Sequence, residues 1–98
     1  MKTILTADIG GTNCRFAHYT LDKDGNLSFI QSKWLKTQTV SSFPALIQAL
    51  EASDFHLSPH EADVAIIAVA GPVAEGRISH PPYIPWKIDL SDIERGIL

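Results

Sequence analysis

A short polar stretch near the start of the chain holds the residue types best suited to chemistry. It reads Asp8-Ile9-Gly10-Gly11-Thr12-Asn13 and joins two apolar segments. Glycines let backbone N–H groups approach an anion closely and adopt positive φ where needed, and the side chains after them add donors. The carboxylate can hold Mg²⁺ directly or through water, because hard cations prefer carboxylate oxygen. The stretch predicts a nucleotide-phosphate site, with these cofactor-binding residues: Asp8, which is also the metal residue, Ile9, Gly10, Gly11, Thr12 and Asn13.

An ordinary hairpin turn is the alternative interpretation of the same residues. Two glycines between strands are common in hairpins, and Asp is common in turns, so the pair Gly10-Gly11 alone favours neither interpretation. The stretch is not a Walker loop, since no Gly-Lys-Ser/Thr follows. It is not a dinucleotide-binding fingerprint either, since residues 14–21 alternate like a strand where that motif has a helix.

Three antiparallel strands are predicted around this stretch, over residues 3–9, 14–22 and 27–35. The first is a short apolar run that enters the glycines, and the second alternates between two faces with the period of two that is typical of strands. The Asp-Gly pair within residues 22–26 is a strong hairpin signal. In the third strand, we expect Leu27 and Phe29 on the face opposite Ile30 and Trp34.

A helix and a fourth strand are predicted next. Residues 37–41 read as a polar link, and Ser42 suits the N-cap of a helix. Apolar residues then recur at the spacing of one helix face: Phe43, Leu46, Ile47 and Leu50. We expect this helix to end near Ser53. The continuous apolar run 64–70 predicts a strand covered on both faces, as in a parallel sheet.

Weaker signals mark the remainder of the chain. Gly71-Pro72 ends the fourth strand at its carboxyl end, where open α/β sheets place ligands. Residues 75–77 read as the turn of a small hairpin, and Ser91 with Glu94 forms a capping box that begins a helix. We expect Trp86 to anchor packing rather than to stack on a sugar ring, since large aromatic residues dominate small cores.

Composition and charge narrow the class of protein. The 98 residues are 45% hydrophobic and 19% charged, with a formal net charge of −3, which indicates one globular domain without affinity for nucleic acid. No stretch approaches the roughly 20 apolar residues of a membrane helix, and the first apolar run is too short for a signal peptide. The single cysteine, Cys14, is expected to pack in the core of a cytoplasmic protein.

Three stretches resemble bacterial glucokinases, which belong to the actin-like ATPase and sugar kinase superfamily. The segment from Asp8 to Ala17 resembles the family's first phosphate motif. Residues 65–73 resemble its buried strand and the turn after it, and residues 84–89 resemble its Pro-Trp-x-Ile-Asp segment. The family usually has Thr-Asn shortly before the tryptophan, whereas residues 79–84 here read Ser-His-Pro-Pro-Tyr-Ile.

The resemblance implies a fold and an activity. The fold is α/β, a ribonuclease H-like mixed sheet of the actin-like ATPase type, with three antiparallel strands followed by a helix and a parallel strand. The activity is ATP-dependent phosphorylation of glucose to glucose 6-phosphate, with ATP and glucose as small-molecule partners and Mg²⁺ as cofactor. Arg15 in the first motif either attracts phosphate or forms a structural ion pair.

With 98 residues, the chain is shorter than the enzymes that it resembles. Family members are two-lobed enzymes, so residues 1–98 are expected to form a truncated, partial amino-terminal lobe. The family's catalytic base lies in an Asn-Asp-Phe motif, which does not occur in these 98 residues. We therefore assign no catalytic residue and expect the chain alone to be inactive. One alternative is a non-catalytic module that associates with itself or a partner through an exposed sheet edge; another is a sugar-responsive regulator of the same superfamily.

Overall fold

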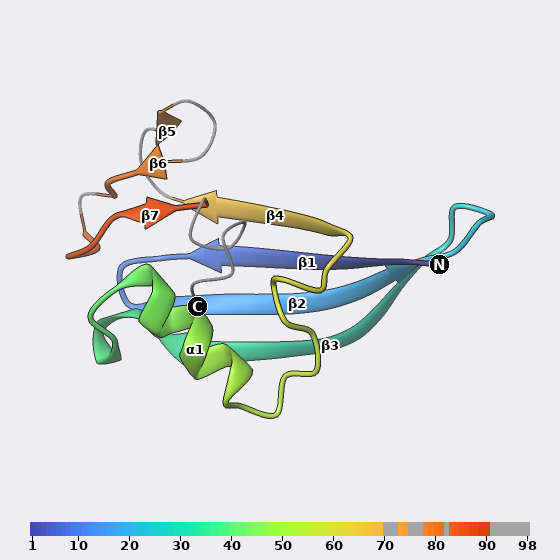
Figure 1. Ribbon diagram of the computed structural model, residues 1–98, viewed down its shortest axis with the longest axis horizontal. Coiled ribbons are helices and arrows are strands. Elements are labelled where there is room, and N and C mark those ends of the chain that lie inside the picture. Colours follow the sequence, from blue (N-terminus) through green and yellow to red (C-terminus); the bar gives the residue numbers. More distant parts are fainter. Residues whose placement is uncertain (70–72, 75–77, 82, 91–98) are drawn as a thin grey trace.

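A four-stranded mixed sheet forms the body of the protein (Figure 1). The structure, a computed structural model, describes residues 1–69, 73–74, 78–81 and 83–90. The sheet has the order β3-β2-β1-β4, with β1 and β2 antiparallel, β2 and β3 antiparallel, and β4 parallel to β1. This arrangement confirms the expected mixed α/β sheet. Its strands are β1 (Lys2–Ile9), β2 (Asn13–Leu21), β3 (Leu27–Lys36) and β4 (Val64–Val69).

The turn between β2 and β3 confirms the Asp-Gly hairpin signal. Gly25 has a φ of 84°, in the left-handed region that favours glycine. One carboxylate oxygen of Asp22 accepts hydrogen bonds from the backbone N–H groups of Asp24 and Asn26, both at 2.9 Å. These hydrogen bonds hold the pKa of Asp22 below its ordinary value, the bond from Asn26 being the largest cause.

A β-bulge in β3 overturns one expectation about its faces. Tyr19 pairs with Phe29 and His18 with Gln31, which leaves Ile30 as the extra residue. An extra residue moves every side chain beyond it to the other face. Phe29 and Trp34 therefore share a face, where simple alternation placed them on opposite faces. The sequence pattern contains no sign of the bulge.

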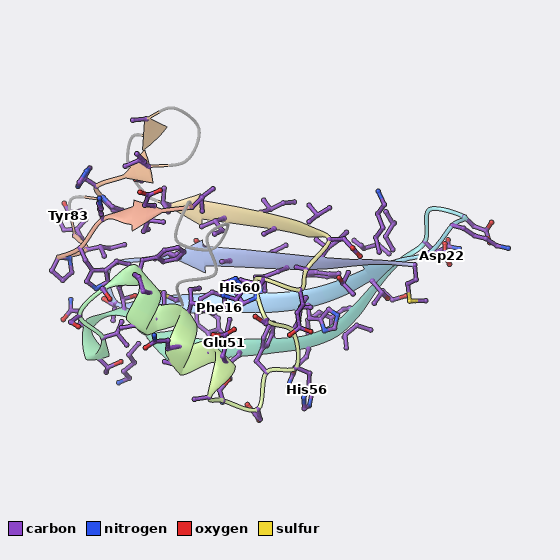
Figure 2. The ribbon with its side chains drawn as sticks, in the orientation of Figure 1. Phe16, Asp22, Glu51, His56, His60 and Tyr83 are labelled. Carbon is purple, nitrogen blue, oxygen red and sulfur yellow. The ribbon has the colours of Figure 1, made fainter. Side chains whose placement is uncertain are left out.

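The helix α1 (Phe43–Glu51) packs on one face of the sheet and encloses the core (Figures 1 and 2). Ser42 is its N-cap, as expected, and its hydroxyl accepts a hydrogen bond from the N–H of Ala45 at 3.1 Å. The helix ends two residues before the expected Ser53. The large fully buried apolar side chains come from both layers: Leu5, Ile9, Cys14 and Phe16 from the sheet, and Phe43, Leu46, Ile47 and Leu50 from the helix.

Polar residues of β3 fasten the segment that leaves α1. The Gln31 side chain donates to the carbonyl of Asp54 at 2.7 Å and accepts from the N–H of His56 at 3.0 Å. Lys33 forms an ion pair with the carboxylate of Asp54 at 2.9 Å, which lowers the pKa of Asp54. These contacts hold the chain against the sheet before it enters β4.

The opposite face of the sheet, here called the open face, is largely exposed, although Ala17 on it is buried. Its large apolar side chains include Ile66, 57% exposed, and Trp34, 63% exposed. The expectation that the strand over 64–70 is covered on both faces is therefore wrong for the described residues. A continuous apolar run predicts burial on both faces, but it does not identify the element that provides the second cover.

A small three-stranded sheet lies at the end of the main sheet where β1 and β4 finish (Figure 1). Its strands are β5 (Val73–Ala74), β6 (Ile78–Ser79) and β7 (Ile88–Asp89), in the order β5-β6-β7. Trp86 packs at 6.4 Å from the ring of Phe43 and donates its indole N–H to the carbonyl of Val40, which confirms a packing role. The predictions for Gly71-Pro72, residues 75–77 and the capping box at Ser91 and Glu94 lie outside the described residues.

Among the described residues, no helix has the length and apolar character that crossing a membrane requires.

The start of β4 is fastened to the start of β1 by a reciprocal pair. The Asp63 carboxylate accepts from the N–H of Thr3 at 2.8 Å and from its hydroxyl at 3.2 Å, and the Thr3 hydroxyl accepts from the N–H of Asp63 at 3.1 Å. The hydrogen bond from the Thr3 N–H is the largest cause of a lowered pKa at Asp63. This pair fixes the parallel register of the two strands.

The variant Asp63→Ala tests this pair. We expect its midpoint of urea denaturation to be lower than that of the parent chain at neutral pH, because both the N–H and the hydroxyl of Thr3 lose their acceptor. A lowered folded-state pKa stabilises the protein above the ordinary carboxyl pKa of 3.8. The difference between parent and variant should therefore shrink as the pH falls below that value. A difference that is constant from pH 7 to pH 3 would contradict this account.

Candidate phosphate-binding loop

The loop between β1 and β2, here called the glycine loop (residues 10–12), is a tight hairpin connection. The two strands stay paired up to Ile9 and Cys14. The N–H of Gly10 donates to the carbonyl of Asn13 at 3.0 Å, which closes the loop. The hairpin interpretation is therefore correct as geometry, and the Gly10 amide is not available to a ligand. Whether the loop also suits an anion depends on its remaining N–H groups.

All three carbonyls of the glycine loop are held by the 3₁₀ turn η1 (Thr37–Thr39). The Thr37 hydroxyl donates to the carbonyl of Gly10 at 2.7 Å. The Gln38 side chain donates to the carbonyl of Gly11 at 3.2 Å, and the N–H of Thr37 donates to the carbonyl of Thr12 at 3.0 Å. Residues 37–41, expected only as a polar link, thus supply the support of the loop.

The positions of these carbonyls determine where the loop's amides point. In a planar trans peptide, the C=O of one residue and the N–H of the next point in opposite directions, and the described chain has no cis peptide. Carbonyls drawn toward η1 therefore turn the N–H groups of Gly11, Thr12 and Asn13 away from it. In the part of the chain that the structure describes, the amides of Gly11 and Thr12 have no hydrogen-bond acceptor.

A buried polar relay connects this support to the core. The Thr37 hydroxyl has one hydrogen, which it gives to Gly10, so it accepts from the thiol of Cys14, whose Sγ lies 3.0 Å away. Both Cys14 and Thr37 are fully buried. Burial raises the pKa of the Cys14 thiol, so the thiol keeps the proton that it donates to the Thr37 hydroxyl. The core role expected for Cys14 is confirmed, with this hydrogen bond in addition.

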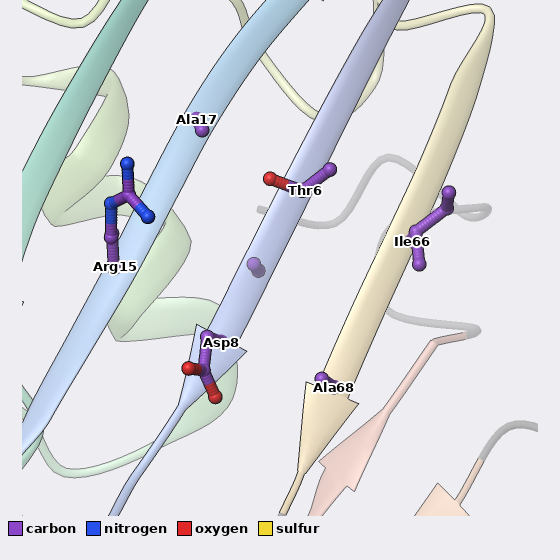
Figure 3. Close-up of a pocket in the computed structure, with 7 residues that line it drawn as sticks. Thr6, Asp8, Arg15, Ala17, Ile66 and Ala68 are labelled. Atoms are coloured by element: carbon purple, nitrogen blue, oxygen red, sulfur yellow. The ribbon is translucent and has the colours of Figure 1, made fainter.

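The open face beside the glycine loop carries a carboxylate and a guanidinium group. Cys14 lies on the face that α1 covers, so η1 approaches the glycine loop from that side. Asp8 and Arg15 are direct cross-strand partners on the other face, and Figure 3 shows them there with Ile66. In the described residues, the Asp8 carboxylate makes no hydrogen bond or ion pair. The Asp8 carboxylate and the amides of Gly11 and Thr12 thus belong to neighbouring residues, and none of them has a partner among the described residues.

Two hollows adjoin these groups. One, of about 260 Å³, lies on the open face and is lined by Asp8, Arg15 and Ile66 among others (Figure 3). The other, of about 440 Å³, lies at the tip of the loop and is lined by Gly11, Thr12, Gln38 and Tyr83. Both are open surface depressions, so this part of the chain forms one wall of a site and does not enclose a ligand.

The two glycines allow close packing, most tightly at Gly11, and neither has a positive φ angle. Gly25 is the only glycine with positive φ among the described residues, so the φ > 0 expectation does not apply to the loop. A Cβ on Gly10 would lie 3.1 Å from the carbonyl oxygen of Asn13. A Cβ on Gly11 would lie 2.9 Å from the Cβ of Tyr83, which lies at the same end of the molecule in Figure 2.

The expected site residues differ in their exposure to solvent. Asp8, Thr12 and Asn13 are exposed, with Asn13 the first residue of β2. Ile9 is fully buried in the core, so only its backbone can contribute. The Arg15 guanidinium lies 6.0 Å from the centre of the Trp34 ring and forms no ion pair with any described residue. Sequence reasoning missed the supporting residues Thr37, Gln38 and Tyr83, because no local pattern marks contacts between such distant segments.

The variant Thr37→Val tests the support of the glycine loop. Valine keeps the shape but leaves the thiol of Cys14 and the carbonyl of Gly10 without a partner, so we expect the free energy of unfolding to fall by about 1–3 kcal/mol. Thr37→Ser keeps the hydroxyl and should cost about 1 kcal/mol or less. Thr39→Ala removes a hydroxyl from the exposed end of the same turn and is the control. Equal losses for the valine and serine variants in urea denaturation would contradict the role of the hydroxyl.

Comparison with known proteins identifies the family. The family model described as Glucokinase matches residues 5–97, and no curated protein matches the chain. A solved glucokinase from an Antarctic psychrotroph is 28% identical with a TM-score of 0.72, over 98% of this chain and 29% of that one. A diol dehydratase-reactivating factor in nucleotide-free form is 22% identical over 80% of this chain and 14% of its own, with a TM-score of 0.42, which supports no inference. The chain thus spans less than a third of the length of the glucokinase it matches, and it belongs to the glucokinase family.

Proposed function

We propose that this chain provides the phosphate-binding part of a kinase that transfers the γ-phosphoryl group of ATP to the 6-hydroxyl of glucose. The observation that supports the proposal best is the orientation of the glycine loop. Its three carbonyls are held by η1, so the N–H groups of Gly11 and Thr12 point away from η1, and neither has an acceptor among the described residues. Backbone N–H groups grouped in this way suit an anion such as a phosphate.

Each residue of the first motif has a distinct role in this proposal. The backbone amides of Gly11 and Thr12 donate to phosphate oxygens, and the side chains of Thr12 and Asn13 add further donors. Ile9 fixes the end of β1 in the core, and Gly10 closes the turn. The carboxylate of Asp8 has no partner among the described residues and lies just before the loop, which fits Mg²⁺ either directly or through a water molecule. Bound Mg²⁺ would neutralise charge on the phosphoryl group during transfer.

We also propose that residues 1–98 correspond to part of an amino-terminal lobe with a ribonuclease H-like sheet. The match covers less than a third of the solved glucokinase chain, which supports this assignment. No Asn-Asp-Phe stretch, the motif of the family's catalytic base, occurs in the 98 residues. These residues alone should therefore bind phosphate without transferring it. The buried, protonated thiol of Cys14 agrees with a reducing, cytoplasmic setting.

Self-association is a second candidate, favoured by the open face. Its exposed apolar side chains include Phe29, Trp34, Val64 and Ile66, and exposed apolar patches and sheet edges often pair with other chains. The two candidates make different demands on the glycine loop. Phosphate binding needs the loop amides, whereas self-association needs the open face, so a measurement that reports on individual amides and on mass separates them.

An NMR titration of the ¹⁵N-labelled chain with Mg·ATP tests the proposed function. We expect the amide signals of Gly11 and Thr12 to shift, and we expect Mg²⁺ to tighten ATP binding. In Asp8→Asn the effect of Mg²⁺ should fall by about tenfold or more, because the carboxylate is lost. Asp24→Asn removes the same charge from the far hairpin turn and should bind like the parent chain.

Two results would count against the proposal. Amide signals of the glycine loop that do not move, in a spectrum with dispersed peaks, would show a folded chain without a phosphate site. An equal loss of Mg²⁺ dependence in Asp24→Asn would remove the specific role of Asp8. Light scattering on the same sample reports the mass, and a strict monomer would exclude self-association.

A further inference from the structure

Lys36 is the last residue of β3 and lies beside the glycine loop. It pairs with Asn13 at the end of the β2–β3 ladder, next to the pair Arg15 and Trp34. Directly opposite residues in an antiparallel pair project from the same face, with Cβ atoms about 4.5–5.5 Å apart. Asn13 alternates with the core residue Cys14, so its side chain and that of Lys36 belong to the open face. Asp8 and Arg15 lie on the same face.

The charge of Lys36 has no partner in the described part of the chain. Its side chain is exposed, and its ammonium group forms neither an ion pair nor a hydrogen bond with any described residue. Lys33, three residues earlier on the covered face, differs in this respect, because it pairs with Asp54 at 2.9 Å. The two lysines of β3 therefore differ. Lys33 holds the segment after α1 against the sheet, whereas the ammonium group of Lys36 has no partner among the described residues.

The backbone around Lys36 is held firmly against the glycine loop. The next residue, Thr37, donates its N–H to the carbonyl of Thr12 at 3.0 Å. The carbonyl of Lys36 itself accepts from the Thr39 hydroxyl at 2.7 Å. The same turn that directs the loop amides therefore also fixes where the lysine side chain starts. Its flexible stem can follow a phosphate group, and its three ammonium donors can bind more than one oxygen.

Arg15 is less suited to this role. Its guanidinium lies over the ring of Trp34, at 6.0 Å from the ring centre, where the cation and the aromatic face attract each other. Binding a phosphate directly would compete with that contact. Lys36 has no such competing contact among the described residues.

We propose that Lys36 is a further phosphate-binding residue, which contacts an oxygen of the polyphosphate whose neighbouring oxygens are held by the amides of Gly11 and Thr12. This inference rests on the proposed function, because it requires phosphate in the glycine loop. It adds a charged side chain from β3 to a site that the first motif builds only from β1, the loop and β2. The chemical class of ligand is a di- or triphosphate group, with or without a nucleoside.

The test compares the binding of inorganic tripolyphosphate and of Mg·ATP by the 98-residue chain and three variants, followed at the amide signals of Gly11 and Thr12. Lys36→Gln should weaken both ligands by roughly three- to tenfold at low salt, as expected for loss of one exposed charged contact. Lys36→Arg keeps the charge and should bind within about twofold of the parent chain. Lys23→Gln, which removes the same charge from the distant hairpin turn, is the matched control.

Salt concentration distinguishes a charge contact from a structural effect. The difference between the parent chain and Lys36→Gln should shrink as salt is raised from about 0.01 M to 1 M, because the Debye length falls from about 30 Å to 3 Å. Weakening by Lys36→Gln that is no greater than that by Lys23→Gln would overturn the role of Lys36 and leave the proposed function intact. Unmoved loop signals in the parent chain would overturn both. Weakening that persists unchanged at high salt would also overturn the inference.

Discussion

The planar trans peptide is the constraint on which the candidate site depends. Because each C=O opposes the N–H that follows it, the chain can aim donors at a ligand only by fastening acceptors on the other side. The turn η1 does this for the carbonyls of Gly10, Gly11 and Thr12 with two side chains and one backbone N–H. The direction of the amides is thus set by contacts within the protein, so the proposed phosphate binding would need little reorganisation of the backbone.

The same contacts connect the candidate site to the hydrophobic core. Thr37 is fully buried and lies between the thiol of Cys14 and the carbonyl of Gly10, so the support of the loop is formed only when β2, β3 and η1 are packed together. Tyr83 lies close to the same loop and leaves no room for a side chain at Gly11. A short, glycine-containing loop that contacts two structured segments can keep a defined conformation.

Much of this architecture could be predicted from local patterns, and the failures have a common physical cause. The strands, the N-cap at Ser42, the Asp-Gly hairpin and the apolar face of α1 all depend on neighbours within a few residues, and the structure confirms them. The motif around Gly10 and Gly11 indicated a short connection between two strands, which the structure confirms. The bulge at Ile30, the burial of Thr37 and the exposure of Ile66 depend on which distant segments meet, and no local pattern contains that information.

A crystal structure of the chain with Mg²⁺ and tripolyphosphate would test the central claim most directly. The orientation of the glycine loop predicts phosphate oxygens at about 2.7–3.2 Å from the N–H groups of Gly11 and Thr12, on the side of the loop where Asp8 lies. The carbonyls should remain bonded to Thr37 and Gln38 as they are without ligand. Phosphate bound on the side of η1, or bound to the loop only after those carbonyls have turned away from η1, would contradict the claim that the amides are directed in advance.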